Sequence, residues 1–547
     1  MKHNIARTGL ATVFAIVLVV IVMPSAARAQ TVTATVNVGS GAGSIAVNPL
    51  TNQIYVPSTG GFSVIDGATN TVATSTLPDA QGYPVAANPV TNTFYLTTVH
   101  QDPECGKTSC PEFALAAVNG TTGVSSETGA GVFFFSEGIA ANPTTNQIYV
   151  AAKFPAVIEG ATNALNRISS SFDAGRVDVN PVTNEIYFAG GLLTVPGGPA
   201  VAVVDGSNNT VTATLTLAAS ASAVAVNPIT NEIYLTIPQN GTVSVIDGAT
   251  SAITTIPVGS NPFSLAINPV TNKIYVANNG SNNITVIDGA TNATTTLTDS
   301  TASGPNAVAV DALTNQIYVA NSGSATVTVI NGSTNALTSI ILPNASGTAH
   351  LALDPVTNIV YALNGGSNNV SVIAGVAGTG APDFAIGTTS GSLTLSSSGQ
   401  ATDTIIVGPP YGSTVDLTCN VSGPTPAPTC ELSASSLTPG PTYGTATLTI
   451  TAPTAAAMLA PSHQRRLGGF YAACFPLLFG ITLLGGSKRR GTWLLAGFLL
   501  VLLILLSSCG GGSQNTGGET GPQSYTVTIT GTSGAIQHST QVTVTVQ

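Results

Sequence analysis

Apolar and polar positions in residues 31–376 alternate in short runs, and the same order of runs recurs along this stretch. Strict alternation over a few residues, bounded by Asn, Pro and Gly, predicts β-strands joined by tight turns. One unit shows the pattern clearly, with predicted strands at residues 264–267, 273–277, 284–287 and 293–297. In the second strand Ile274 and Val276 are expected to face one side of the sheet and Tyr275 the other.

Eight copies of an Asn-Pro-x-Thr-Asn motif, or a variant of it, separate the first and second predicted strands. They begin at Asn48, Asn88, Asn142, Asn180, Asn227, Asn268, Asp311 and Asp354. Recurrence at roughly 40 residues with four strands per unit predicts a β-propeller. Residues 31–38 match a fourth strand, and the last unit lacks one, so the N-terminal strand is expected to complete the last blade. This count predicts eight blades, or seven if one irregular unit is not a blade.

These residues resemble the YVTN family of β-propeller repeats over residues 31–376. The resemblance is carried by Ile274-Tyr-Val-Ala-Asn278 and Val286-Ile-Asp-Gly-Ala-Thr-Asn292. It implies a surface-layer-like or periplasmic interaction protein without cofactor or turnover. Some related propellers are lactonases or carry redox cofactors in the central channel, so a propeller enzyme is the alternative.

Charge narrows the range of partners. The chain has a net charge of -10, and residues 31–380 contain five basic and eighteen acidic residues. A surface this poor in Lys and Arg cannot neutralise many phosphates, which argues against nucleic acid as a partner.

Residues 1–29 resemble an export signal, with a basic start, an apolar stretch and Ala27-Arg-Ala29 before Gln30; an uncleaved membrane anchor is the alternative. Export to the cell envelope would place the cysteines in an oxidising compartment. Two pairs have spacings that suit disulfides, Cys105 with Cys110 and Cys419 with Cys430. A metal site formed by these four thiols is the weaker alternative, because no CxxC or neighbouring His accompanies them.

The remaining third of the chain predicts a different organisation. Residues 377–382 form a linker, and the strands in 383–452 resemble a bacterial immunoglobulin-like sandwich. Apolar segments 467–486 and 491–508 predict a transmembrane helical hairpin with Lys488-Arg-Arg490 on the cytoplasmic side. Residues 524–547 alternate like two more strands, which would complete the sandwich around the hairpin. A rival interpretation is lipid attachment at Cys509, which follows a lipoprotein-like stretch.

Candidate partner-binding residues lie where the repeat is interrupted, because loop variation on a rigid scaffold is where binding usually resides. Segments 97–112 and 190–199 lengthen loops on the face opposite the Asn-Pro turns, and 132–135 is an apolar run near them. The candidate residues in these segments are His100, Asp102, Glu104, Lys107, Phe133, Phe134, Phe135, Leu192 and Leu193.

Catalytic patterns are otherwise missing from the sequence. The repeated Asp residues stand in Asp-Gly turns, where the carboxylate is expected to cap backbone N–H groups and the glycine to adopt positive φ; they are Asp66, Asp205, Asp247 and Asp288. The five histidines form no cluster, and no catalytic residue, metal ligand or cofactor motif is predicted. The sequence therefore predicts a membrane-anchored, non-catalytic binding or scaffolding module whose partner is an unknown envelope protein or polysaccharide.

Overall fold

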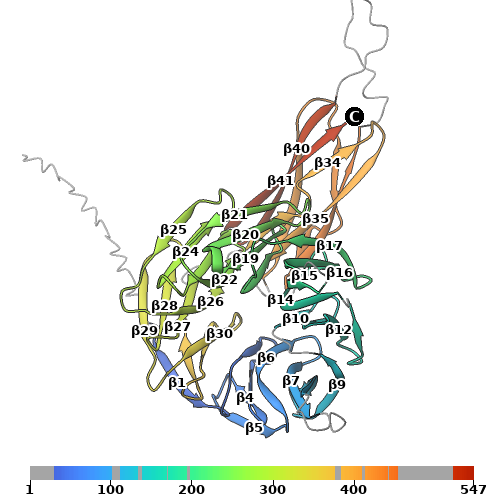
Figure 1. Cartoon of the computed structure of the whole chain (residues 1–547). Helices are drawn as coiled ribbons and strands as arrows, with labels where there is room; N and C mark the ends of the chain where they lie inside the picture. The colour runs from blue at the N-terminus through green and yellow to red at the C-terminus, as the bar shows by residue number, and fades with distance from the viewer. Residues whose placement is uncertain are drawn as a thin grey trace, which may run out of the picture.

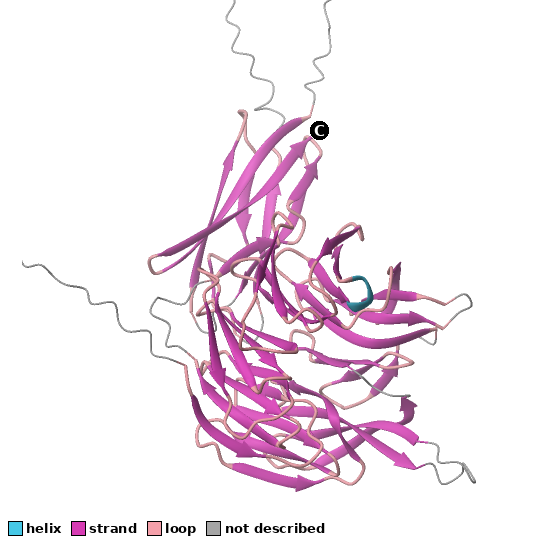
Figure 2. Cartoon of the chain, turned by 60° about the vertical axis from the view of Figure 1, so that its left-hand side comes forward, coloured by secondary structure: helices cyan, strands magenta, loops and turns pink. Residues whose placement is uncertain are grey.

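The computed structural model describes residues 30–101, 111–133, 138–168, 171–193, 197–375, 384–408, 413–440, 443–453 and 522–547. Strands dominate these ranges (Figure 2), and their single helix is the short 3-10 turn η1 (Pro238–Asn240). No helix in the described ranges has the length and apolar character that a membrane crossing requires. The predicted leader 1–29, the linker 377–382 and the predicted spans 467–486 and 491–508, together with Cys509, lie outside the described residues.

Residues 32–374 form eight four-stranded antiparallel sheets, numbered here as blades 1 to 8 in chain order. Blades 1 to 4 consist of β2 (Ala46–Asn48), β3 (Gln53–Ser58), β4 (Gly61–Asp66) and β5 (Val72–Thr76); β6 (Ala80–Asn88), β7 (Thr93–Gln101), β8 (Pro111–Asn119) and β9 (Ser125–Phe133); β10 (Gly138–Asn142), β11 (Gln147–Ala151), β12 (Ala156–Glu159) and β13 (Leu165–Arg167); and β14 (Phe172–Asn180), β15 (Glu185–Leu192), β16 (Pro199–Asp205) and β17 (Thr210–Thr216). Blades 5 to 8 consist of β18 (Ala223–Asn227), β19 (Glu232–Ile237), β20 (Thr242–Asp247) and β21 (Ile253–Pro257); β22 (Pro262–Asn268), β23 (Lys273–Asn278), β24 (Asn283–Asp288) and β25 (Thr294–Leu297); β26 (Pro305–Asp311), β27 (Gln316–Asn321), β28 (Thr326–Asn331) and β29 (Leu337–Ile341); and β30 (Thr348–Asp354), β31 (Ile359–Asn364), β32 (Asn369–Ala374) and β1 (Val32–Asn37).

The eight sheets close into a propeller-like ring (Figure 1). The first strand of each blade contacts the first strand of the next, and β30 of blade 8 contacts β2 of blade 1. The N-terminal strand β1 pairs with β32, with Val36 opposite Val370, and so supplies the fourth strand of blade 8. The predicted closure and the count of eight blades are confirmed, and the seven-bladed alternative is excluded.

The core of the ring consists of clusters between neighbouring blades. Tyr275 of blade 6 packs against Ile317 and Val319 of blade 7, and Tyr361 of blade 8 packs against Ile54 of blade 1 in the same way. Ile274 and Val276 pack on the opposite side, against Tyr234 of blade 5, so the predicted opposition of the tyrosine and its flanking apolar residues is confirmed. Burial raises the pKa of Tyr275 to about 12, because the ionised phenolate would lose its hydration. The buried second-strand tyrosines are Tyr55, Tyr95, Tyr149, Tyr187, Tyr234, Tyr275, Tyr318 and Tyr361.

Hydrogen bonds between the Asn-Pro turns join neighbouring blades. The first Asn accepts a hydrogen bond from the backbone N–H two residues later, as Asn268 does from Val270 at 3.0 Å. Its amide nitrogen donates to the last Asn of the next turn, as Asn268 does to Asn315 Oδ1 at 2.9 Å. The same bond joins Asn48 to Asn92, Asn88 to Asn146, Asn142 to Asn184, Asn180 to Asn231 and Asn227 to Asn272. Between blade 8 and blade 1, Asp354 stands in place of the first Asn. The side-chain amide of Asn52 donates to Asp354 Oδ2 at 3.1 Å, in the amide orientation that gives both its nitrogen and its oxygen a hydrogen-bond partner.

The repeated Asp residues serve the turns between third and fourth strands. Asp66 Oδ1 accepts hydrogen bonds from the N–H groups of Ala68 and Thr69, and Asp205, Asp247 and Asp288 cap their turns likewise. The expected positive φ at the glycine is wrong: it occurs at Asn70, with φ 58°. Glycine is required at position 67 for space, because an added Cβ would lie 1.9 Å from Asn52 Oδ1.

The C-terminal residues form two further sheets that share one core. The first has the order β33 (Ala385–Thr388), β35 (Gln400–Gly408), β39 (Gly444–Thr451), β37 (Thr429–Leu432). The second has the order β34 (Ser392–Leu395), β41 (Ile536–Val546), β40 (Gln523–Ser533), β36 (Val415–Ser422), β38 (Ser436–Leu437). Residues 523–546 thus add two strands to the second sheet. β40 and β41 pair with each other as a hairpin, β40 also pairs with β36, and β41 also pairs with β34.

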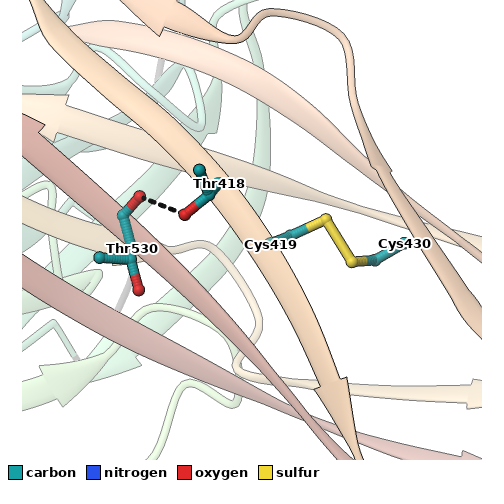
Figure 3. Close-up of a disulfide and its surroundings, with 4 residues drawn as sticks. All are labelled: Thr418, Cys419, Cys430 and Thr530. Atoms are coloured by element: carbon teal, nitrogen blue, oxygen red, sulfur yellow. Dashed lines mark hydrogen bonds between the residues drawn. A yellow bond between two sulfur atoms is a disulfide. The ribbon is translucent and has the colours of Figure 1, made fainter.

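A disulfide joins the two C-terminal sheets. Cys419 on β36 is bonded to Cys430 on β37 (Figure 3), which confirms this predicted pair. On the same strand Thr418 donates to the carbonyl oxygen of Thr530 on β40. A cross-link closing a loop of this length stabilises a fold by about 3 kcal/mol. The other predicted pair, Cys105 with Cys110, lies outside the described residues.

The C-terminal unit packs on the Asn-Pro turns of blades 4 to 6. Ala385 and Ile406 form a buried cluster with Ile229, and Val182 and Val270 pack beside it. The contact is close at β33, where a Cβ added to Gly387 would lie 2.6 Å from the Ile229 carbonyl oxygen. One face of the ring is therefore partly covered, and the opposite face lies away from this unit.

Substitution of Asn268 by Ala should destabilise the ring. It removes the bond to Asn315 and leaves the partly buried backbone N–H of Val270 without its acceptor, which together cost about 1–3 kcal/mol. The midpoint of urea unfolding, followed by far-UV circular dichroism, should fall accordingly. Asn240→Ala, at an exposed position, is the matched control, and equal midpoints for the two variants would contradict the structural role of the turn.

Substitution of Val36 by Asp should prevent closure. Val36 is buried in the cluster between blades 8 and 1, and an unpaired carboxylate there costs several kcal/mol. Opening the ring would expose the edge of β32, so the variant should elute as aggregates in size-exclusion chromatography. Thr35→Asp, on the exposed side of the same strand, should elute like the wild-type protein, and a monomeric Val36→Asp variant would refute the closure argument.

Candidate functional site

The interruption in blade 2 lengthens a hairpin. Strands β7 and β8 extend to Gln101 and Pro111, with His100 opposite Glu112, so His100 lies in a strand and not in the predicted loop. The other candidate residues of this segment lie outside the described residues; they are Asp102, Glu104 and Lys107, with Cys105 and Cys110.

The other two interruptions are also partly strand. Phe133 is the last residue of β9 and pairs with Phe113 of β8, whereas Phe134 and Phe135 lie outside the described residues. Leu192 ends β15 and packs partly buried against the cluster between blades 3 and 4. Leu193 follows it and is 39% exposed. The structure does not bring these residues together into one described site.

A central cavity of about 700 Å³ lies among the first strands of the eight blades. Every blade contributes to its wall; the lining residues are Gly43, Ser44, Pro84, Gly138, Ile139, Arg176, Val177, Ser222, Ala223, Val224, Phe263, Ser264, Asn306, Ala307, Ala349 and His350. They stand in the first strands or just before them, three to five residues ahead of the Asn-Pro turns, which stand at the other end. The cavity therefore lies toward the face that the C-terminal unit leaves uncovered. The β7–β8 and β15–β16 connections belong to that same face.

Equivalent positions around the wall can be compared directly. Four residues before the turn, six blades carry small residues or proline: Ser44, Pro84, Gly138, Ala223, Ser264 and Ala307. Blade 4 carries Arg176 at this position and blade 8 carries His350. Both occupy the same place in the strand register, because each pairs with the residue that lies two positions after the tyrosine of the second strand. Blades 4 and 8 are opposite in a ring of eight. The two long ionisable side chains therefore project from opposite walls at one level.

Arg176 is held against the wall by backbone acceptors. Its Nε–H donates to the carbonyl oxygen of Ser222 in blade 5 at 2.7 Å, and one Nη–H donates to the carbonyl oxygen of Gly175 at 2.8 Å. These bonds fix the plane of the guanidinium group at the boundary between two blades. The group stays charged at any pH that the protein encounters.

His350 is exposed to the cavity, yet the blades enclose it on most sides. This enclosure lowers its pKa below the usual value, because protein surrounds the charged ring in place of bulk water, and the positive charge of Arg176 adds to the effect. At neutral pH the imidazole is therefore mainly uncharged and can both donate and accept a hydrogen bond.

Asp178 is a third exception on the same strand as Arg176. Seven blades have alanine at this position, opposite the tyrosine, namely Ala46, Ala86, Ala140, Ala225, Ala266, Ala309 and Ala352. Asp178 accepts hydrogen bonds from the N–H groups of Val179 at 2.9 Å and Val226 at 2.8 Å. Burial raises its pKa to about 6, and these two bonds only partly oppose the rise.

Arg176, Asp178 and His350 were not predicted as site residues. The signal was present in the sequence, because aligning the eight units on their turns places an ionisable residue among small ones at just these positions. Among the described residues, no group of three or more His, Cys, Asp or Glu side chains is arranged to hold a metal ion. The chemistry that the cavity offers is therefore that of one guanidinium, one imidazole and hydrogen-bonding neutral groups.

Replacing Asp178 by Ala should change how stability depends on pH. The raised pKa means that the folded protein holds this proton more tightly than the unfolded chain, so the wild-type free energy of unfolding falls as pH rises from about 4 to about 6. A rise of this size corresponds to roughly 3 kcal/mol. Between pH 4 and pH 7, the free energy of unfolding of Asp178→Ala, measured with urea, should rise by about that much relative to that of the wild type. Asp173→Ala, at an exposed position of the same strand, is the control, and a constant difference for Asp178→Ala would contradict the assignment.

Comparisons with known proteins add little to this picture. No family model matches the sequence, and no curated protein matches it. Among solved structures, hydrazine synthase of Kuenenia stuttgartiensis is similar over 61% of this chain and 96% of that chain, with 15% sequence identity and a TM-score of 0.41. A likeness at this level carries no argument about function. Over the residues that the structure describes, the chain is all-β, with eight propeller-like blades and a two-sheet C-terminal unit.

Proposed function

We propose that this protein is an exported, membrane-anchored β-propeller that acts as a non-catalytic binding module at the cell envelope. Its ligand-binding site in this proposal is the central cavity. The observation that supports it best is the placing of Arg176 and His350 at one level of a wall that is otherwise built from small residues. Polar side chains at a few positions of a preformed cavity are typical of small-molecule sites.

The position of the cavity supports the same proposal. It lies toward the face where the extended β7–β8 hairpin and the β15–β16 connection lie, and the C-terminal unit covers the other face. In this arrangement the partner-binding loops proposed from the sequence would surround the entrance. The partner that carries the ligand would be an envelope protein or polysaccharide, because the chain has too few basic residues for nucleic acid.

The resemblance to the YVTN repeat family and to bacterial immunoglobulin-like sandwiches fits this role. Eight blades whose second strands carry an apolar-Tyr-apolar motif, and a two-sheet C-terminal unit, are what those resemblances lead one to expect. Anchoring through segments 467–486 and 491–508 is part of the proposal.

The second candidate is an enzyme with its site in the channel, as the sequence alternative has it. His350 lines the cavity and its pKa lies below the usual value, so its imidazole could act there as a general base. In that case His350→Gln would abolish turnover of a bound compound without abolishing its binding.

Filling the cavity should abolish ligand binding. The full-length protein would be tested in detergent against a panel of neutral hexoses, hexuronates, amino acids and dicarboxylates, by thermal melting and isothermal titration calorimetry. We expect at least one class to bind the wild type, and Ala307→Trp, which places a bulky ring in the cavity, to lose that binding while melting normally. Val211→Trp, on an exposed position of the outermost strand β17, should bind like the wild type. Binding that persists in Ala307→Trp, or no binding by any probe, would refute the cavity as the site.

A further inference from the structure

Among the described residues, one permanent positive charge lines the cavity. Residues 31–380 contain five basic residues in all, and of the four that the structure describes, Arg176 stands in the cavity wall. Hydrogen bonds to the carbonyl oxygens of Ser222 and Gly175 orient the guanidinium group at the cavity wall. A planar guanidinium with parallel N–H groups matches a carboxylate in both charge and shape.

A second polar group in the wall points to a ligand that donates hydrogen bonds. Asn306 lines the cavity in blade 7, and its Oδ1 is buried without a hydrogen-bond partner among the described residues. A buried acceptor left without a donor costs about 1–3 kcal/mol, so a ligand hydroxyl that reached it would recover this free energy. Ser44 and Ser264 add hydroxyl groups to the same wall.

An aromatic side chain completes the set. Phe263 lines the cavity from blade 6 and is 44% exposed, whereas Phe62 and Phe188 are almost fully buried. Its ring offers an apolar face to the C–H side of a saturated ring. The cavity of about 700 Å³ is within the range that small-molecule sites occupy.

From these groups we infer that the cavity binds a hydroxylated ring carboxylate, of which a hexuronate is the simplest example. Its carboxylate contacts Arg176, one of its hydroxyls donates to Asn306, and its ring lies against Phe263. The inference rests on the proposed function of the cavity and names its ligand class.

The test measures affinity for D-glucuronate, D-glucose and acetate by isothermal titration calorimetry with the full-length protein. Glucuronate should bind at least tenfold more tightly than glucose, which lacks the carboxylate, and than acetate, which lacks the hydroxylated ring. Arg176→Gln should weaken glucuronate binding about tenfold to a hundredfold, as expected for loss of a charged hydrogen-bonding partner. Arg176→Lys should be intermediate, because it keeps the charge but not the fork. Asn306→Leu should weaken glucuronate binding and leave acetate binding unchanged.

Lys273→Gln is the matched control, because it removes the same charge from the turn end of β23, away from the cavity wall. Its affinity for glucuronate should equal that of the wild type, and melting temperatures of all variants verify folding. Equal affinity for glucuronate and glucose, or no effect of Arg176→Gln on glucuronate binding, would overturn the inferred ligand class. The Ala307→Trp variant tests separately whether the cavity is a binding site. Failure of all three compounds to bind a folded wild-type protein overturns the inference as well, and the wider panel then decides whether the cavity binds anything else.

Discussion

A four-stranded sheet of this size can bury its two apolar faces only against other sheets, and the ring satisfies this constraint for all eight blades at once. Each tyrosine packs into the apolar face of the following blade, and the turn amides join the same neighbours at one end. No blade is self-sufficient in this arrangement. The stability of the whole therefore depends on the interfaces between blades, which explains why the same residues recur in every unit.

A uniform wall also makes exceptions informative. Seven alanines and one Asp178 occupy one position, and six small or proline residues with Arg176 and His350 occupy another. Blade 4 sends both of its exceptional side chains to the backbone of blade 5, so the polar groups that it brings to the centre are satisfied by the ring itself. Arg176 and His350 line the cavity and add nothing to the packing that the other blades lack, which is why we propose a role in binding for these two residues.

Much of the fold could be predicted because it depends on local patterns that are repeated. The strand order, the two-sided Tyr strands and the closing strand all follow from alternation and turn residues. The cavity residues could not be found by searching for motifs, because Arg176 and His350 are far apart in the chain and meet only through the ring. The repeat also could not predict which turn residues are buried. At the third position of the motif, Val182, Ile229 and Val270 pack under the C-terminal unit. Leu50, Val90 and Val356, at the same position in other blades, are more than half exposed. The need for glycine at position 67 also could not be predicted from its own turn, because it comes from the close approach of Asn52 in another turn.

The closing strand has a consequence for how the protein reaches its native state. Thr33 of β1 bonds to Val372, 339 residues away, so the first strand to be synthesised is among the last to find its partner. Contacts of such long range make folding slow, and until they form the edge of β32 is a template for pairing with other chains. Completion of the ring is thus a kinetic checkpoint. A chain that stops short of its last blade leaves its own first strand without a place to bind.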